Sequence, residues 1–185
     1  MEMNQRNFET DKRRVDKFEP QIKRICGEVF IKTAPKKVDC KEATDLLVLD
    51  LNPIRIACRV RYYEDLFKYF NEFTMRVSRP SGVKTELEKI LNGWCGYNFY
   101  GFADKSDTYI KQWFIGDLSV FRDEYSALKL SGKIEKRTNS DETKFCAFKI
   151  KDLSEKFIYA NGYRKYIMIE KSLDDPINNV INIYR

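Results

Sequence analysis

Three acidic residues lie just before an apolar run. Asp39, Glu42 and Asp45 fall within VDCKEATD, and Asp45 belongs to the run TDLLVLDL that follows. Carboxylate oxygens at the start of a strand can bind a hard cation such as Mg²⁺, and bound Mg²⁺ can stabilise charge on a phosphodiester and generate hydroxide. Asp45 is therefore a candidate catalytic residue and metal ligand. The alternative is a polar loop in which Asp45 only caps the strand.

A carboxylate and an ammonium group lie one helical turn apart further along the chain. Glu86 and Lys89 fall within VKTELEKILNG, whose apolar spacing predicts a helix, and residues three positions apart are neighbours on one helical face. Glu86 could be a second metal ligand, and Lys89 could offset the charge that develops on a scissile phosphate. The alternative is an ordinary surface pair.

Basic residues are concentrated in the segment from Arg55 to Lys84. This segment contains seven bases and three acids, which gives +4 of the chain's net charge of +6. Arginine binds phosphate through paired hydrogen bonds. Five basic residues are therefore candidates for nucleic-acid contacts: Arg59, Arg61, Arg76, Arg79 and Lys84. The aromatic residues between Tyr62 and Phe70 could stack on unpaired bases. The alternatives are a solvated basic face and an aromatic core.

Several chemistries are excluded by composition. The 185-residue chain contains no histidine, which removes Ser-His-Asp and Cys-His catalysis and imidazole zinc sites. Its five cysteines form no CxxC, and its eight glycines form neither GxGxxG nor a P-loop. No apolar run reaches the roughly 20 residues of a membrane span, and the first residues lack a signal-peptide core. We expect a soluble, cytoplasmic protein.

The patterns predict one α+β domain over residues 15–185, preceded by a flexible basic arm over residues 1–14. Residues 44–51 read as a central strand, and the two-residue link Asn52-Pro53 predicts that they form an antiparallel hairpin with residues 54–61. In IRIACRVR, alternation places Cys58 and Val60 on one face, and Arg59 and Arg61 on the other.

The remaining elements follow from apolar spacing and turn residues. A first helix is expected to have Pro20 in its first turn and to end at Gly27. Asp117 is the expected N-cap of a helix over residues 117–129. Strands are expected at residues 28–32, 72–79, 97–104 and 109–117, a hairpin around residues 137–141, and a last helix over residues 152–160.

A series of short motifs between Cys40 and Asp104 resembles a family of small phage and mobile-element proteins of unassigned function. The motifs are ATDLL, RVR, FT-x-R, TEL-x-K and GW-x-x-Y-x-x-YGFAD, and the later DETKFCAF resembles the hairpin that closes such proteins. Their architecture is similar to the restriction-endonuclease-like PD-(D/E)XK nuclease core. The resemblance implies a mixed central sheet flanked by helices, with a C-terminal β-hairpin and helix.

The resemblance also implies a site. Asp45 matches the aspartate at the start of the second strand of that core, whereas IACRVR lacks the acid-x-Lys motif of its third strand. Glu86 and Lys89, on the neighbouring helix, are the substitutes. Asp45 and Glu86 would then bind Mg²⁺.

Three functions are compatible with this reading. The first is a metal-dependent nuclease, and the second is a nucleic-acid-binding module on the same fold. The third is a catalytically inactive phage interaction protein that binds or inhibits a host protein or nucleoprotein complex. We expect a nuclease-like nucleic-acid-binding protein, with the inactive interaction protein as the alternative.

Overall fold

The structure is a computed structural model that describes residues 8–33, 46–48, 54–69, 71–78, 85–139, 142–164 and 179–183. Its helices are α1 (Phe8–Phe30), α3 (Tyr63–Tyr69), α4 (Glu86–Leu91) and α5 (Leu118–Leu130), with 3-10 turns at Ile150–Asp152 and Glu155–Phe157. Its strands are β1 (Ile31–Thr33), β2 (Leu46–Val48), β3 (Ile56–Arg61), β4 (Glu72–Ser78), β5 (Tyr97–Ala103), β6 (Ile110–Asp117), β7 (Glu135–Thr138), β8 (Lys144–Lys149), β9 (Ile158–Arg164) and β10 (Asn179–Ile183). None of the described helices combines the length and apolar character needed to cross a membrane.

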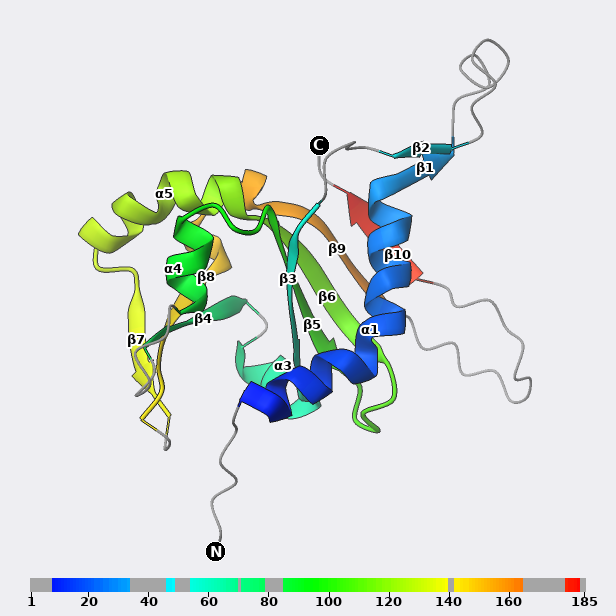
Figure 1. The fold of residues 1–185 in the computed structure, drawn as a ribbon, viewed down its shortest axis with the longest axis horizontal. Helices are drawn as coiled ribbons and strands as arrows, with labels where there is room; N and C mark the ends of the chain where they lie inside the picture. Colours follow the sequence, from blue (N-terminus) through cyan, green and yellow to red (C-terminus); the bar gives the residue numbers. More distant parts are fainter. Residues whose placement is uncertain are drawn as a thin grey trace, which may run out of the picture.

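A mixed five-stranded sheet lies at the centre of the fold (Figure 1). Its order is β10-β9-β6-β5-β3, in which β3 runs parallel to β5 and the other neighbours are antiparallel. A second sheet, of order β4-β8-β7, is antiparallel throughout. The predicted α+β class and the mixed central sheet flanked by helices are therefore confirmed.

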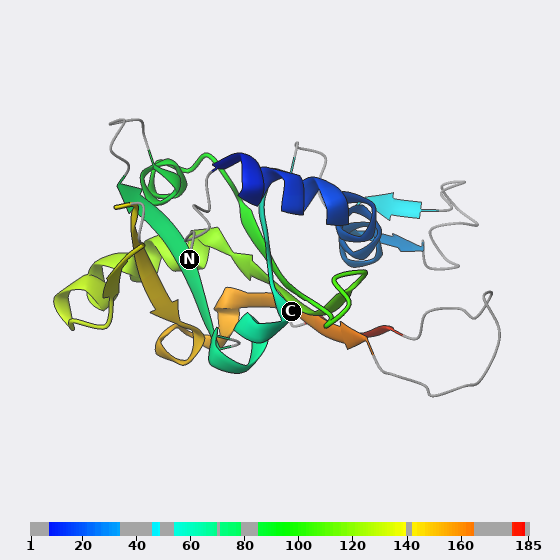
Figure 2. The ribbon, with the colours of Figure 1, turned by 90° about the horizontal axis from the view of Figure 1, so that it is seen from below.

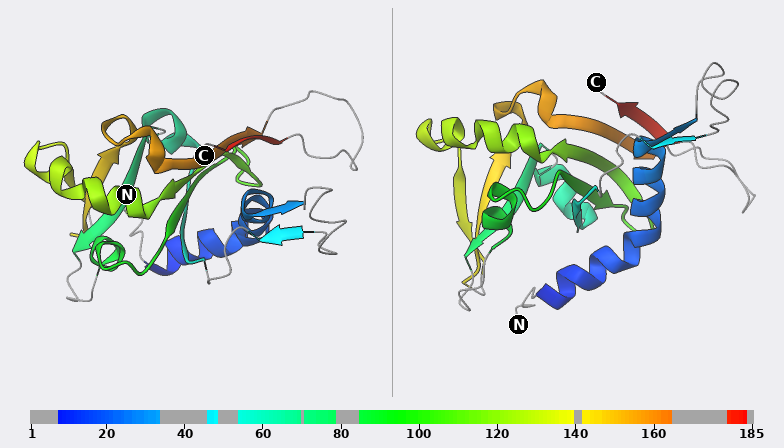
Figure 3. Two further views of the ribbon diagram at one scale, coloured as in Figure 1. Left: turned by 90° about the horizontal axis from the view of Figure 1, so that it is seen from above. Right: turned by 45° about the horizontal axis from the view of Figure 1, so that its top comes forward.

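The central sheet is covered on both faces (Figure 2). Helix α1 packs on one face, where Phe18 and Ile22 contact buried residues of the sheet such as Val60 and Phe99. The other face packs against the three-stranded sheet and helices α4 and α5 (Figure 3), in a cluster that includes Phe73 and Phe121. The two cores account for the apolar residues on both sides of β5 and β6, because alternate strand residues point to opposite faces.

The alternation predicted for β3 is confirmed. Val60 is buried against the α1 side of the sheet, and Ile56 and Cys58 pack against the same cluster. Arg59 and Arg61 project toward the opposite side, where they contact Thr74 of β4. Strand β3 is thus apolar on one face and charged on the other.

The predicted hairpin between residues 44–51 and 54–61 is wrong for the described residues. Strand β2 pairs with β1 in a separate two-stranded sheet, so it is not central, and β3 pairs in parallel with β5. The reason lies in the tertiary structure. The apolar strand β5 offers β3 a pairing edge, and in this pairing Phe99 lies opposite Cys58. A short link between two strand patterns does not by itself select that partner.

The predicted helix over residues 152–160 is also wrong. The chain forms two 3-10 turns and then enters β9, which lies between β6 and β10. Gly162 lies opposite the bulky Trp113, and Ala160 opposite Ile115, so small residues of β9 face large residues of β6. Sheet pairing outweighs the local helical spacing.

Helix α1 is longer than expected. It begins at Phe8 rather than near Pro20, and it continues beyond Gly27 to Phe30, which moves the strand expected at residues 28–32 to β1. Pro20 lies inside the helix, where it cannot donate to the carbonyl of Asp16. Asp16 is exposed, so water can satisfy that carbonyl, and Figures 1 and 3 show that α1 changes direction along its length.

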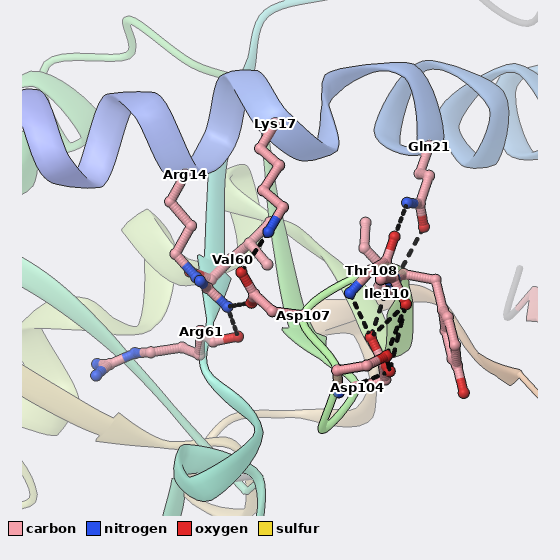
Figure 4. A network of polar contacts seen from close by, with 11 residues as sticks. Arg14, Lys17, Gln21, Val60, Arg61, Asp104, Asp107, Thr108 and Ile110 are labelled. Carbon is pink, nitrogen blue, oxygen red and sulfur yellow. Dashed lines mark hydrogen bonds and ion pairs between the residues drawn. The ribbon is translucent and has the colours of Figure 1, made fainter.

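A polar network joins α1 to the central sheet (Figure 4). Arg14 donates to the carbonyls of Val60 and Arg61 at 3.1 Å each and to Asp107 at 2.6 Å, and Lys17 also pairs with Asp107 at 2.6 Å. One turn further on, Gln21 bonds both to the carbonyl of Thr108 and to the N–H of Ile110. Helix α1 is therefore fixed to both the end of β3 and the β5–β6 turn.

Asp104 organises that turn from within. Its carboxylate accepts hydrogen bonds from the N–H groups of Ser106, Thr108 and Tyr109 and from the Ser106 hydroxyl. Burial raises the pKa of Asp104, but these hydrogen bonds outweigh it and hold the pKa at about 2.

We expect Asp104→Asn to lower the free energy of unfolding by about 2 kcal/mol at neutral pH. The folded-state pKa lies below the unfolded value, so this contribution is complete above about pH 4 and is lost as the pH falls toward 2. Urea unfolding of both proteins from pH 7 to pH 2 measures it. The same substitution at exposed Asp123 controls for net charge, and a pH-independent difference would contradict the assignment.

Gly116 lies where a side chain has no room. A Cβ atom there would be 2.5 Å from the ring of Phe157, which is fully buried. We expect Gly116→Ala to lower the free energy of unfolding by roughly 1–3 kcal/mol. Gly27→Ala is the control, because a Cβ at this position in α1 meets nothing within 4 Å and should stabilise by about 1 kcal/mol. Chemical denaturation of the two variants should give shifts of opposite sign.

Candidate functional site

Two edge strands contribute the charged residues of the candidate site. Strand β3 is an edge of the central sheet, β4 is an edge of the three-stranded sheet, and α3 connects them. Arg61 donates through Nε to the Tyr100 hydroxyl at 2.7 Å and through Nη2 to Thr74 Oγ1 at 2.6 Å. The two hydroxyl oxygens are 3.4 Å apart. Arg61 therefore links the two sheets through a pair of buried hydroxyl groups.

Arg59 lies beside Arg61 and adds a carboxylate to the group. It donates to Thr74 Oγ1 at 3.3 Å and to Glu86 Oε2 at 2.7 Å. The same Glu86 oxygen accepts the backbone N–H of Arg76 at 3.2 Å. The first residue of α4 is thus bound to both edge strands.

We name this group the two-sheet cluster. Its members are Arg59, Arg61, Asp65, Thr74, Glu86 and Tyr100. Asp65, on α3, is 3.6 Å from Nη1 of Arg61. The two arginines and two acids balance, so the cluster carries no net charge.

Exposure differs across the cluster. The side chains of Arg59 and Glu86 are 26% and 28% exposed, whereas Thr74 and Tyr100 are buried. A ligand in solvent would therefore meet the Arg59–Glu86 pair first. Arg61 lies deeper, and its guanidinium carbon is 5.8 Å from the ring centres of Tyr69 and Tyr100.

A second ion-pair group borders the cluster on the three-stranded sheet. Arg137 of β7 binds the Glu72 carboxylate through two nitrogens and also pairs with Glu135 at 2.7 Å. The ring of Tyr69 is 5.3 Å from Arg137, so this tyrosine lies near both arginine groups. These hydrogen bonds raise the pKa of Arg137, which stays protonated.

Two of the residues that we assigned to one catalytic group have different partners in the structure. Glu86 and Lys89 both belong to α4, but Glu86 binds Arg59, whereas the Lys89 ammonium lies 5.7 Å from the ring centre of Trp94. Among the candidate phosphate contacts, Arg59 and Arg61 are together in the cluster, and Arg76 contributes its backbone N–H. Asp45, Arg79 and Lys84 lie outside the described residues, so the proposed meeting of Asp45 with Glu86 stays a prediction.

The Glu86 carboxylate, a predicted Mg²⁺ ligand, already has partners within the protein. Glu86 Oε2 already accepts two N–H donors, one of them from a guanidinium that would repel a divalent cation. No group of three or more acidic or cysteine residues in the described part of the chain has a metal-binding arrangement. A Mg²⁺ ion at this Glu86 oxygen would have to displace Arg59.

Sequence reasoning missed Thr74, Tyr100 and Asp65. A hydroxyl group inside an otherwise apolar strand carries no motif, and its role depends on which strand lies opposite. The FT-x-R and YGFAD segments that contain Thr74 and Tyr100 did stand out in the sequence, but as motifs rather than as partners of Arg61.

The chain was compared with family models, curated proteins and solved structures. No family model matches it, and neither the curated proteins nor the solved structures contain a match. The resemblance to the restriction-endonuclease-like core stays a prediction.

We expect Arg59 and Glu86 to be energetically coupled. A double-mutant cycle of Arg59→Gln and Glu86→Gln, measured by urea unfolding, should give a coupling energy of about 1 kcal/mol or more, because both side chains are three-quarters buried. The exposed pair Glu19 and Lys23 on α1 is the control, with an expected coupling of about 0.3–0.5 kcal/mol. Equal coupling in the two pairs would show that the first is an ordinary surface pair.

Proposed function

We propose that the protein is a nuclease-like protein that binds nucleic acid through the phosphate backbone. The proposal rests on one observation: Arg59 is held in a fixed position at the partly exposed end of the two-sheet cluster, with its guanidinium already bound to a carboxylate. A phosphodiester group presents two oxygens that share one negative charge, as a carboxylate does, so it could replace Glu86 as the acceptor.

The distribution of charge supports the same ligand. The segment that contains β3, α3 and β4 carries most of the net positive charge of the chain, and a positive field raises the rate of encounter with a polyanion. Lys89, one turn beyond Glu86, adds a further base on α4.

Phosphodiester cleavage is the more specific form of the proposal. It requires Asp45 and Glu86 to bind Mg²⁺, whose chemistry would be to activate water and stabilise negative charge. Because Arg59 occupies the Glu86 carboxylate, binding is the function that the described geometry supports first.

The interaction protein remains a second candidate. The observation that favours it is that both arginines of the cluster already have acceptors within the protein. In that case the basic segment would bind an acidic surface of a host protein, and affinity for nucleic acid would be absent.

Removal of two bases should reduce the number of phosphate contacts. We expect Arg59→Gln combined with Lys89→Gln to weaken binding of a labelled duplex oligonucleotide. The slope of log K against log[KCl] should become less negative by about 0.9 for each of the two phosphate contacts that are lost. Fluorescence anisotropy over a KCl series measures both quantities. The control is Lys23→Gln with Arg24→Gln, which removes the same charge from exposed positions of α1 and should leave the slope unchanged.

A plasmid assay with Mg²⁺ or Mn²⁺ tests cleavage in the same preparations. Cleavage by the native protein that is lost in Glu86→Gln would support the nuclease. Equal slopes for the two double variants would reject this face as the binding site, and a native protein without affinity for nucleic acid would favour the interaction protein.

A further inference from the structure

Trp94 has an exposed ring in a basic environment. It lies between α4 and β5, and it is 52% exposed, whereas Trp113, the other tryptophan, is 3% exposed and stacked on Phe99. A tryptophan buries up to about 250 Å² when it is packed, so an exposed one forgoes a large hydrophobic gain. Trp94 does not contribute to either described core cluster.

The backbone holds Trp94 in a fixed position. Gly93, with φ of 77°, donates to the Ile90 carbonyl at 2.9 Å, and Trp94 donates to the Lys89 carbonyl at 3.1 Å. This pair of bonds forms a Schellman motif at the end of α4. Beyond it, Arg122 donates to the Cys95 carbonyl at 3.0 Å, and Gly96 donates to the Arg55 carbonyl at 3.0 Å. Both sides of Trp94 are therefore tied to the rest of the fold.

The Schellman motif explains the turn but not the choice of tryptophan. An apolar contact between the Trp94 position and the Lys89 position is common in this motif, and a leucine would provide it. The lysine ammonium instead lies 5.7 Å from the centre of a ring that stays half open to solvent.

Cationic residues lie close to the turn that carries Trp94. Burial raises the pKa of the neighbouring Cys95 thiol, and the Glu86 carboxylate adds to this increase. Three cations act on the thiol in the opposite direction: Arg55, Arg122 and Lys89. Lys89 lies over the ring, Arg122 is bonded to the Cys95 carbonyl, and Arg55 is bonded through its own carbonyl to Gly96. A half-exposed aromatic ring on a turn with these cationic neighbours is complementary to an anion that carries a flat apolar group.

We propose that Trp94 stacks on an unpaired base of single-stranded nucleic acid while Lys89 and Arg55 contact the flanking phosphates. Every base has a face on which an aromatic side chain can stack, but in a duplex the faces are already covered by neighbouring bases. The proposal rests on the proposed nucleic-acid function and adds its substrate class. We name Trp94, Lys89 and Arg55 together the Trp94 surface. Helix α4 is then the common border of the Trp94 surface and the two-sheet cluster.

Tryptophan emission tests the contact directly. We expect an oligothymidylate of about twelve nucleotides to quench part of the emission of the native protein, since an OB-fold site typically spans roughly 4–16 nucleotides. In Trp94→Phe the quenching of tryptophan emission should disappear, because the buried Trp113 remains as the sole tryptophan and is shielded from the ligand. In Trp113→Phe the quenching should be retained.

Affinity provides the second measurement. Trp94→Ala should weaken binding of the oligothymidylate by roughly 5- to 150-fold, the typical effect of removing one aromatic side chain that stacks on a base. It should change binding of a duplex of the same length much less. Tyr163→Ala is the matched control, because Tyr163 is an exposed aromatic residue on β9 and should have no effect. Circular dichroism and Trp113 emission verify that each variant is folded.

The outcomes separate this proposal from the proposed function. If Trp94→Ala binds the single strand as tightly as the native protein does, stacking is overturned while nucleic-acid binding stands. The same holds if the native protein binds the duplex alone. If neither probe binds at low salt, the proposed function is overturned and this proposal falls with it.

Discussion

Strand β3 has to satisfy an apolar environment and a charged one at the same time. Val60 faces the core under α1, and Arg59 and Arg61, on either side of it, face β4. A shift of one residue in the pairing with β5 would bury both guanidinium groups in the apolar core and expose Val60 to charged groups, at a cost of several kcal/mol. This alternation therefore fixes the register of the parallel pair, and with it the positions of α1 and of the three-stranded sheet on opposite faces.

Ion pairs and hydrogen bonds connect the layers of the fold. Buried or partly buried arginines bond to groups on other helices, strands or turns. Arg14 connects α1 with β3 and with Asp107 of the β5–β6 turn, and Arg61 connects β3 with both Thr74 and Tyr100. A charged side chain is costly to bury without a partner. Each layer of the fold must therefore place a hydrogen-bonding or charged group opposite the buried charge of the next layer. The same requirement explains why Glu86 lies against β3 and β4 rather than toward solvent beside Lys89.

The sequence predicted the elements better than their partners. The strands β5 and β6, the Asp117 cap, whose side chain accepts the N–H of Ser119, and the β7–β8 hairpin all follow from local patterns and are confirmed. The parallel pairing of β3 with β5 could not be predicted, because the chain between them includes α3, a strand of another sheet and α4. The same holds for the candidate site. The alternation of apolar and charged residues in β3 predicted that its arginines share one face, but their hydroxyl partners depend on that long-range pairing.

The internal pairing of Arg59 has a consequence for selectivity. Any anion that binds this guanidinium must compete with Glu86, which is already in place at 2.7 Å, so a simple anion gains little. In the proposed function, a ligand that also engages the Trp94 surface would gain additional binding energy from the same short helix, since α4 begins at Glu86 and its Lys89 lies over the tryptophan ring. A single strand, with a flexible backbone and exposed bases, can meet both requirements together, whereas a duplex can offer only its phosphates. Glu86 would then act against weak and non-specific anions, and the selection of single strands would come from the two surfaces acting in combination.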